Sequence, residues 1–524
     1  MMVSCTIAQT QKPTLQDLQA KDRSVENLVN KAATFFSSHS VSESAHAFTK
    51  DPKWRIGERF IFLVDQTGIC YAFGNQYKRI WRSFAQLTDV LGIPILHHLK
   101  RMTPGTFVSL YLNNAPMRTF VKKVKKGNIS YYIGSGIFPQ DDQYASLDLI
   151  KSTLQLMEEQ GLAKTLQTVN NQFGPLVYGE MGVIIFDPEG NILAYPFDSA
   201  IVGQNINKLS GKRPSVVATF RNDFNQFANN KQIQSAHYTT KTGDITNKLY
   251  LSKHQNPHTK KDFILATLYY EGINDSAIKK LVNDAAQFIT QSHDTKKALQ
   301  TITQGDPRFK IGTSGIEIYD FKGNCIANGM YPSIVNTNRY SYQDFFGQYP
   351  IEKLINILTN QDHVWITYHE NNAFKSFYAQ RLDLPSESII VGAPHWPTNK
   401  ARSCVYMVKR AQEVIERHGY ANAFSKFVAD SPDFLHGDVY PRVITEDGIV
   451  IANGQFQKNT IWSSLQSPLN NQYHDVKKII ETARQGGGWV KYQHLNAPFS
   501  AYVASVDQPS TDKKLVIFSG FYTK

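Results

Sequence analysis

One strand–turn–strand segment occurs four times in this 524-residue chain, and this internal repeat constrains the fold more than any other feature. The copies read FIFLVDQTGICYAFG, GVIIFDPEGNILAYP, GIEIYDFKGNCIANG and YPRVITEDGIVIANG. Each copy turns at Asp65, Asp187, Asp320 or Thr445, and these positions lie 122, 133 and 125 residues apart. Asp or Thr can hydrogen-bond the turn backbone, and the glycine three residues later accepts a conformation that a side chain resists. The segment therefore predicts a β-hairpin.

Helical patterns surround every hairpin in the same order. The long amphipathic stretches VENLVNKAATFF, LIKSTLQLMEE, IKKLVNDAAQFI and VYMVKRAQEVIE precede the hairpins, each followed by a shorter helical pattern. Another helix and further strands come after each hairpin. About 125 residues is a typical length for a domain that buries its own core. We therefore expect an α+β chain of four tandem domains, each a long N-terminal helix plus a central antiparallel sheet, at 24–140, 146–272, 276–397 and 400–524, after an N-terminal tail at 1–23.

Charge and motifs give no support to nucleic-acid binding or catalysis. The net charge of +12 is spread along the chain, without a basic stripe interleaved with aromatic residues or a zinc-ligand spacing. The histidine pair His254 and His258 lies in a loop, so its rings share no fixed face for a metal. Cys70 and Cys325 occupy matching strand positions and are expected to be packed core thiols. We expect no enzyme activity, no catalytic residues, no cofactor, no metal and no nucleic-acid partner.

The N-terminus leaves two alternatives open. Residues Met2-Val3-Ser4-Cys5 loosely resemble a bacterial lipoprotein cleavage box, but the hydrophobic stretch that should precede such a box is missing. One alternative is a remnant of an export signal with a lipid anchor at Cys5; the other is a disordered tail. A stretch of 18 apolar residues occurs nowhere, so a transmembrane segment is not expected.

The glycine triplet at 486–488 in RQGGGWVKYQ belongs between a helix and a strand. A phosphate loop would place its glycines ahead of a helix, where backbone N–H groups face the anion. Here the helical pattern of Val476, Ile479, Ile480 and Ala483 comes before the glycines, and an alternating strand follows them. Gly486 is therefore expected at a helix C-cap.

Several of these segments resemble the small Cache domain of bacterial receptors. The second unit carries the first half of that pattern in its DPEG hairpin turn at 187–190 and its VGQN segment at 202–205, and the fourth carries the second half in GGGWVKY at 486–492 and IFSGFY at 517–522. The third unit lacks the glycine triplet, and the fourth has Thr445 for the hairpin Asp. The resemblance implies a PAS-like fold, with a pocket between the central antiparallel sheet and a covering loop.

The resemblance also implies a function. Domains of this family usually lie outside the cytoplasmic membrane and sense small organic acids, amino acids or similar metabolites. This chain would then be a non-enzymatic, periplasmic or extracytoplasmic sensing or binding protein, lipid-anchored if Cys5 is modified, with a membrane receptor or another protein as signalling partner. The alternative is an interaction scaffold whose repeats have lost their pockets and bind a protein partner.

A ligand pocket in such a domain is expected to have aromatic walls and a few polar groups. The candidate ligand-binding residues are Tyr195, Asp198, Trp365, Tyr368, Tyr378, Trp489, Tyr492 and Tyr502. Aromatic residues that alternate along strands also fill cores, and this simpler role stays open for each of them. The hydroxyl groups of Tyr492 and Tyr502 favour a place beside a cavity, because a buried phenol needs a partner.

Overall fold

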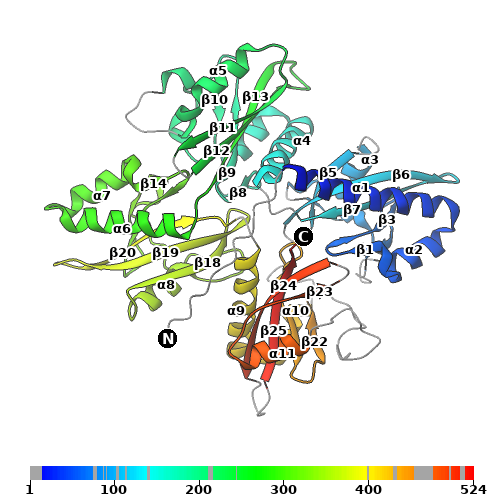
Figure 1. Cartoon of the computed structure of the whole chain (residues 1–524). Coiled ribbons are helices and arrows are strands. Elements are labelled where there is room, and N and C mark those ends of the chain that lie inside the picture. Colours follow the sequence, from blue (N-terminus) through cyan, green and yellow to red (C-terminus); the bar gives the residue numbers. More distant parts are fainter. Residues whose placement is uncertain are drawn as a thin grey trace.

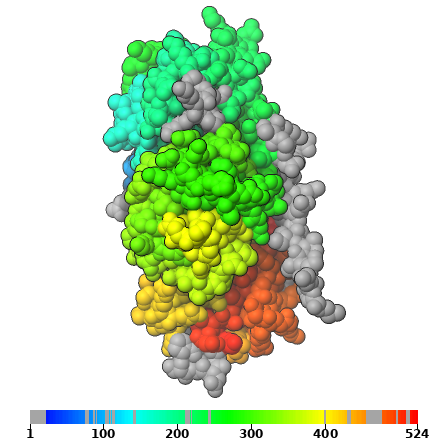
Figure 2. All heavy atoms as spheres, turned by 90° about the vertical axis from the view of Figure 1, so that its left-hand side faces the viewer, coloured from blue at the N-terminus to red at the C-terminus, as the bar shows by residue number. Residues whose placement is uncertain are grey.

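The computed structural model describes residues 15–74, 80–86, 88–89, 91–101, 106–112, 115–138, 142–209, 216–242, 245–397, 400–428, 434–453, 476–494, 497–507 and 514–523. Within these residues the main antiparallel sheets number four, and each sheet with its helices forms one unit. The four units surround a common centre (Figure 1). Viewed from the side of unit 3, unit 2 lies above it and unit 4 below it (Figure 2).

The first two units span the N-terminal half of the chain. Unit 1 comprises α1 (Leu15–Ser38), α2 (Val41–Lys50), β1 (Arg55–Ile56), β2 (Arg59–Phe60), β3 (Phe62–Asp65), β4 (Cys70–Phe73), α3 (Ile95–Arg101), β5 (Thr106–Leu112), β6 (Ala115–Lys126) and β7 (Ile129–Ile137). Unit 2 comprises α4 (Asp142–Val169), β8 (Val177–Tyr178), β9 (Met181–Phe186), β10 (Ile192–Ala194), α5 (Arg221–Asn229), β11 (Ser235–Thr242), β12 (Ile245–Gln255) and β13 (Asp262–Glu271).

The last two units repeat the same succession. Unit 3 comprises α6 (Asp275–Gln291), α7 (Thr295–Thr303), β14 (Lys310–Ile311), β15 (Ser314–Gly315), β16 (Glu317–Asp320), β17 (Cys325–Asn328), α8 (Pro350–Leu358), β18 (His363–Glu370), β19 (Ala373–Asp383) and β20 (Ser388–His395). Unit 4 comprises α9 (Ala401–His418), α10 (Tyr420–Val428), β21 (Arg442–Thr445), β22 (Val450–Asn453), α11 (Val476–Arg484), β23 (Gly488–His494), β24 (Ala497–Asp507) and β25 (Lys514–Tyr522).

All four sheets have one strand order. It is β4-β3-β7-β6-β5 in unit 1, β10-β9-β13-β12-β11 in unit 2, β17-β16-β20-β19-β18 in unit 3 and β22-β21-β25-β24-β23 in unit 4. The predicted hairpin thus supplies the first two strands, and the last strand of each unit pairs with the first strand of the hairpin. The α+β class with central antiparallel sheets is confirmed. The exact domain boundaries stay a prediction.

The turn chemistry expected for the hairpins is present. The Oδ1 atom of Asp320 accepts hydrogen bonds from the backbone N–H groups of Lys322 and Asn324, at 2.9 and 2.8 Å. Thr445 performs the same role with its hydroxyl oxygen, which accepts from the N–H of Ile449 at 3.0 Å. Gly323 has φ +85°, where a side chain would be strained. The turn prediction is therefore confirmed for both the Asp and the Thr form.

The structure also describes the glycine connector of unit 4 and the start of the first helix. Gly486 follows α11 with φ +99° and donates its N–H to the carbonyl of Ala483, which confirms the helix-to-strand connector. α1 begins at Leu15, so residues 15–23 of the predicted tail lie in this helix, and the boundary between tail and domain stays a prediction. The early part of α1 is held by an ion pair of 2.8 Å between Asp22 and Arg118 of β6. Cys5 lies outside the described residues.

Each sheet separates two apolar layers. The long N-terminal helices cover one face, as α6 and α7 do in unit 3, where Ile278, Val282 and Ile302 pack on the sheet. The other face, which we call the inner face, is covered by the shorter helix and the loop after the hairpin. Cys70 and Cys325 are fully buried on this face, as predicted for packed thiols. Among the described residues, no helix is long and apolar enough to cross a membrane.

The units are joined in reciprocal pairs through one repeated contact. A glycine turn before each hairpin, with φ between +59° and +63°, packs on the aromatic residue at the end of the last strand of another unit. We call Gly57, Gly179, Gly312 and Gly437 the docking glycines. They pack on Tyr522, Trp396, Tyr270 and Phe138, respectively. Unit 1 and unit 4 therefore dock on each other, and so do unit 2 and unit 3.

Candidate functional site

The inner face of unit 3 encloses a polar chamber of about 20 Å³. Its charged and aromatic lining comes from the hairpin, the covering loop and the outer strands of the sheet: Glu317, Tyr319, Arg339, Tyr368, Glu370 and Lys375. The described residues of this face also include the apolar side chains of α8, which pack beneath the chamber. A buried group of four charges in a domain core is unusual, because charges are costly to remove from water unless they are paired.

Lys375 of β19 is the centre of this network. Its side chain is 4% exposed, and its ammonium lies 2.7 Å from Glu370 Oε2 and 3.3 Å from Glu317 Oε1. Burial alone would lower the pKa of Lys375, but the two glutamates outweigh it and hold that pKa well above its ordinary value. Burial alone would raise the pKa of Glu370, but Lys375 and Arg339 outweigh it and hold that pKa below its ordinary value. Lys375 and Glu370 are therefore both ionised at neutral pH.

Arg339 brings the second cation from the covering loop. Its guanidinium lies 3.9 Å from the centre of the Tyr342 ring, and its closest carboxylate oxygen, Glu370 Oε1, is at the long distance of 3.5 Å. The Nε atom of Arg339 is buried and has no hydrogen-bond acceptor among the described residues. A guanidinium has five N–H donors, and the Nε–H donor of Arg339 can accept a further partner.

Tyrosines complete the walls of the chamber. The hydroxyl of Tyr319 donates to Glu317 Oε2 at 2.8 Å. Burial raises the pKa values of Tyr319, Tyr331, Tyr342 and Tyr368, so all four remain neutral phenols. The site therefore offers neutral hydroxyl groups, two cations and two carboxylates within one small volume.

Units 1 and 2 have uncharged residues at the positions of Glu317 and Lys375. The registers place Phe62 of unit 1 and Ile184 of unit 2 at the position of Glu317. They place Met117 and Asn247 at the position of Lys375.

The covering loop of unit 3 also has a charge where units 1 and 2 have an apolar residue. The bridges at 69–83, 191–205 and 324–338 align Arg339 with Phe84 and Ile206. Phe84 and Ile206 are both buried in apolar clusters. Units 1 and 2 have thus filled the place that unit 3 keeps polar.

Unit 2 closes the mouth of the chamber. Phe173 and Phe197 line it, and the Phe197 ring lies 6.2 Å from that of Tyr331. Phe173 is 56% exposed, so it is held less firmly than the rest of the wall. Asn371, which also lines the chamber, accepts a hydrogen bond of 2.7 Å from the N–H of Gly179. The chamber is therefore built into the contact between units 2 and 3.

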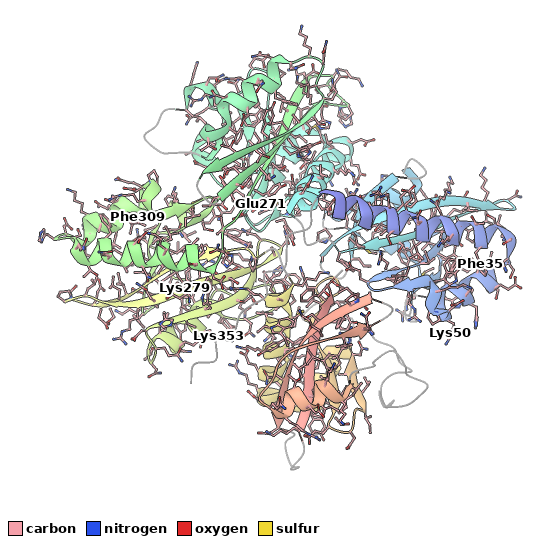
Figure 3. All side chains as sticks on the ribbon, in the orientation of Figure 1. Phe35, Lys50, Glu271, Lys279, Phe309 and Lys353 are labelled. Atoms are coloured by element: carbon pink, nitrogen blue, oxygen red, sulfur yellow. The ribbon has the colours of Figure 1, made fainter. Side chains whose placement is uncertain are left out.

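The predicted aromatic sites of unit 3 do not share one wall. Tyr368 lines the chamber, but Trp365 and Tyr378 lie on the opposite face of the sheet, where their rings are 5.1 Å apart. Lys279 of α6, labelled in Figure 3, lies above the Tyr378 ring at 5.6 Å. The physical reason is the alternation of strand side chains: residues 365 and 368 differ by an odd number and point to opposite faces.

The same separation occurs in unit 4. Tyr492 is buried on the inner face, whereas Trp489 and Tyr502 meet at 5.5 Å on the other face. Trp489 is 43% exposed, so this pair lies at the protein surface. The segment 454–475, which follows the hairpin in this unit, lies outside the described residues.

In unit 2 the two predicted residues have structural roles. Tyr195 is buried in the apolar cluster of the inner face, and burial raises its pKa. Asp198 accepts a hydrogen bond of 3.2 Å from the N–H of Ala200 and so caps a short 3-10 helix at Ser199–Ile201. These contacts account for both residues without a ligand. Ligand binding by the eight predicted residues stays a prediction.

The sequence contained a signal for the charged residues that were missed. Glu317 lies within GIEIYD and Lys375 within AFKSFY, where each interrupts a strand that is otherwise apolar or neutral. A charge in the centre of a buried strand requires a partner. Comparison of the four hairpins would have shown that only the third and fourth, with Glu317 and Arg442, place a charge there.

Three solved structures are similar to parts of this chain. A methyl-accepting chemotaxis protein from Vibrio parahaemolyticus RIMD 2210633 is 16% identical, with 23% of this chain and 86% of that chain covered and a TM-score of 0.20. A Cache chemosensory domain that recognises carboxylic acids is 14% identical, with 23% and 91% covered and a TM-score of 0.21. The ligand-binding domain of the Pseudomonas fluorescens chemoreceptor CtaA, in complex with L-isoleucine, is 12% identical, with 46% and 82% covered and a TM-score of 0.20.

These structures are a chemotaxis protein, a chemosensory domain and a chemoreceptor domain, respectively, and the likeness concerns the fold alone. No family model matches the sequence, and no curated protein matches it.

Proposed function

We propose that this chain is a non-enzymatic sensing protein that binds a small carboxylate-bearing metabolite, an organic acid or an amino acid, in the chamber of unit 3. The observation that carries the proposal is Arg339, a partly buried guanidinium whose Nε has no acceptor and whose closest carboxylate is 3.5 Å away. A ligand carboxylate would form the short, charge-assisted hydrogen bonds that Glu370 does not. The resemblance of the sequence to Cache domains supports a location in the periplasm or outside the cell.

Ligand entry would require movement between units 2 and 3. A chamber of about 20 Å³ has room for a single water molecule, since one water needs about 10–15 Å³ by this measure. An amino acid or organic acid would fit only after Phe173 and Phe197 of unit 2 move outward. Binding would thereby change the contact between the two units, which is the kind of displacement that a sensor transmits to a partner.

Ligand binding in the chamber is expected to depend on the guanidinium of Arg339. A thermal-shift screen of organic acids and amino acids is expected to find ligands that stabilise the chain, by about 2.7 kcal/mol at a hundredfold excess over Kd. The substitution Arg339→Gln should weaken the affinity about 10- to 100-fold, because charge-assisted hydrogen bonds contribute about 1.5–3 kcal/mol. Titration calorimetry of both forms measures the change.

Arg381 provides the matched control. It lies on β19 of the same unit but pairs with the exposed Asp383 at 2.7 Å, so Arg381→Gln should leave the affinity unchanged. Equal affinities for wild type and Arg339→Gln, or an equal loss in both variants, would contradict the proposal.

The second candidate function is an interaction scaffold. The observation in its favour is that the inner faces of units 1 and 2 are filled by apolar side chains, as Phe62, Phe84 and Met117 show in unit 1. A chain that gives no stabilisation with any acid of the screen, and from which a protein partner is recovered, would support this function.

A further inference from the structure

His369 of β18 is a buried histidine that lies outside the chamber of unit 3. Tyr368 and Glu370, the residues on either side of it, line the chamber, so strand alternation directs the His369 side chain to the opposite face of the sheet. His369 is 4% exposed. At this end of β18 the opposite face packs on α9 and on the loop before β21, which belong to unit 4. The histidine is therefore buried in the contact between units 3 and 4.

Aromatic rings from both units enclose this imidazole. From unit 3, the rings of Phe345 and Phe346 lie 5.2 Å from it, and the ring of Phe374 lies 5.3 Å from it. From unit 4, the ring of His436 lies at 5.3 Å. The ring of Tyr406 in α9 completes the cluster, at 5.7 Å from Phe346 and 5.3 Å from Phe374. We call these five residues the aromatic box, and it is closed only while the two units are in contact.

The aromatic box holds His369 without a hydrogen bond to its buried Nε2 atom. This atom has no hydrogen-bond partner among the residues that the structure describes. The neighbouring carboxylate oxygen, Asp344 Oδ2, accepts instead from the backbone N–H of His369 at 3.2 Å and from the hydroxyl of Tyr406 at 2.8 Å. Burial, and after it the neighbouring His436, hold the pKa of His369 well below its ordinary value. The side chain is therefore a neutral imidazole at neutral pH.

The elements packed around the aromatic box carry other titratable and charged groups. They come from the strands β18 and β19, from segment 343–348, from α9 and from the loop before β21: Glu370, Lys375, Asp344, Tyr406, Arg410, His436 and Asp438. Glu370 and Lys375 face the chamber on the other side of the sheet. Burial raises the pKa of Asp344, and it raises the pKa of Asp438 to about 7. A carboxyl group with a raised pKa binds its proton more tightly in the closed contact, so both carboxyl groups favour the closed form in acid, and His369 acts against them.

We propose that protonation of His369 opens the contact between units 3 and 4, so that this histidine makes the contact sensitive to acid. In the closed contact a charge on the imidazole would be buried without a hydrogen-bond partner at Nε2, which is costly. When His436 and Tyr406 move away with unit 4, water reaches the ring and hydrates the imidazolium. A proton is therefore taken up on opening, and through His369 acid favours the open form. The inference does not depend on a ligand in the chamber.

The thiol of Cys404 reports the opening in the full chain. It is fully buried in an apolar cluster that Phe346 and Phe374 of unit 3 form with residues of unit 4. The rate of Cys404 alkylation is measured by mass spectrometry at pH 7.5 and 5.5, and each rate is divided by that of the unfolded chain at the same pH. An imidazole in water has a pKa of about 6.5, so the relative rate should rise about tenfold more in the wild type than in His369→Phe. Comparing the two forms removes the opposing effect of the carboxyl groups.

His363→Phe is the matched control. His363 is exposed on the same strand, so this variant should respond to pH as the wild type does. Alkylation of Cys70, buried in unit 1, should not depend on His369.

Each result decides the proposal. Equal pH responses of the wild type and His369→Phe overturn it, and so does a response of His363→Phe that matches that of His369→Phe. An effect of His369→Phe that is as large at Cys70 as at Cys404 also overturns it, because the whole chain would then unfold instead of the contact. If His369→Phe does not fold, His369→Leu takes its place in the same comparison.

Discussion

Replacing Lys375 with methionine is expected to destabilise unit 3 by about 3–5 kcal/mol at neutral pH. The substitution removes the ammonium that lies 2.7 Å from Glu370 and 3.3 Å from Glu317, and it leaves two buried carboxylates without that partner. Hydrogen exchange of the amides in β16, β19 and β20 measures this effect locally, which matters because four units need not unfold in one step.

The pH dependence of this loss follows from Glu370. Burial raises the pKa of Glu370 and Lys375 lowers it, so without Lys375 the folded-state pKa of Glu370 rises relative to the value of about 4.3 in the unfolded chain. A carboxyl group with a raised folded pKa destabilises the protein above that pKa and ceases to do so as the pH falls towards 4. The penalty should therefore be largest above neutral pH and should shrink in acid.

Two further variants separate charge from packing. Lys280→Met is the control, because Lys280 forms an exposed pair of 2.6 Å with Asp284, and a pair of this kind on a helix contributes about 0.3–0.5 kcal/mol. The double variant Glu317→Phe with Lys375→Met copies the arrangement of Phe62 and Met117 in unit 1. It should be less destabilised than Lys375→Met alone. If Lys375→Met destabilises unit 3 no more than Lys280→Met does, the buried network does not stabilise the unit as we expect.

The fold followed from local sequence to a large extent. The turn residues at Asp65, Asp187, Asp320 and Thr445 predicted the hairpins because the side chain and the glycine act within five residues of one another. The strand order in each sheet agrees with the predicted succession of hairpin, helix and further strands. The ion pair between Asp22 of α1 and Arg118 of β6 could not be predicted in this way, because the two residues lie far apart along the chain.

The residues of the unit 3 chamber were predicted less well than the fold, because side chains along a strand alternate between the two faces of a sheet. The aromatic residues were grouped by closeness in sequence, but Trp365 and Tyr368 point to opposite sides of the sheet. The chamber depends on Arg339, Glu317 and Lys375, which come from the loop and from two strands that are not neighbours in the sheet. Only the paired registers of the units show that the positions of Glu317 and Lys375 are apolar in unit 1, where Phe62 and Met117 occupy them.

The contacts of the docking glycines could not be predicted from local sequence either, because they join residues of different units. Gly57 and Tyr522 stand near opposite ends of the chain, and no local pattern links them. The four docking glycines do share a sequence feature, since each is followed by Glu58, Glu180, Thr313 or Asp438, a residue with a side-chain oxygen. Glu58 and Asp438 meet at Lys400, and Glu180 meets Thr313. The repeat thus encodes the pairing of units as well as their fold.

The second large effect is expected for Gly179→Ala, which tests this pairing. A Cβ atom at Gly179 would lie 2.9 Å from the Trp396 ring, a distance that real Cβ contacts essentially never show, so the ring or the turn must shift. The left-handed backbone at φ +59° adds strain of about 1–2 kcal/mol, and the overpacking adds about 1–3 kcal/mol. We expect units 2 and 3 to lose protection against hydrogen exchange at their contact, first at the amide of Gly179.

Gly127 gives a control with the same backbone. It also has φ +59°, but a Cβ atom there would meet nothing within 4 Å. Gly127→Ala therefore reports the strain alone, and the difference between the two variants isolates the contact with Trp396. A smaller ring in the Trp396→Phe background should relieve part of the clash and make the double variant more stable than the sum of its single effects predicts. If Gly127→Ala and Gly179→Ala destabilise the protein equally, the packing of Gly179 on Trp396 contributes nothing to the contact between units 2 and 3.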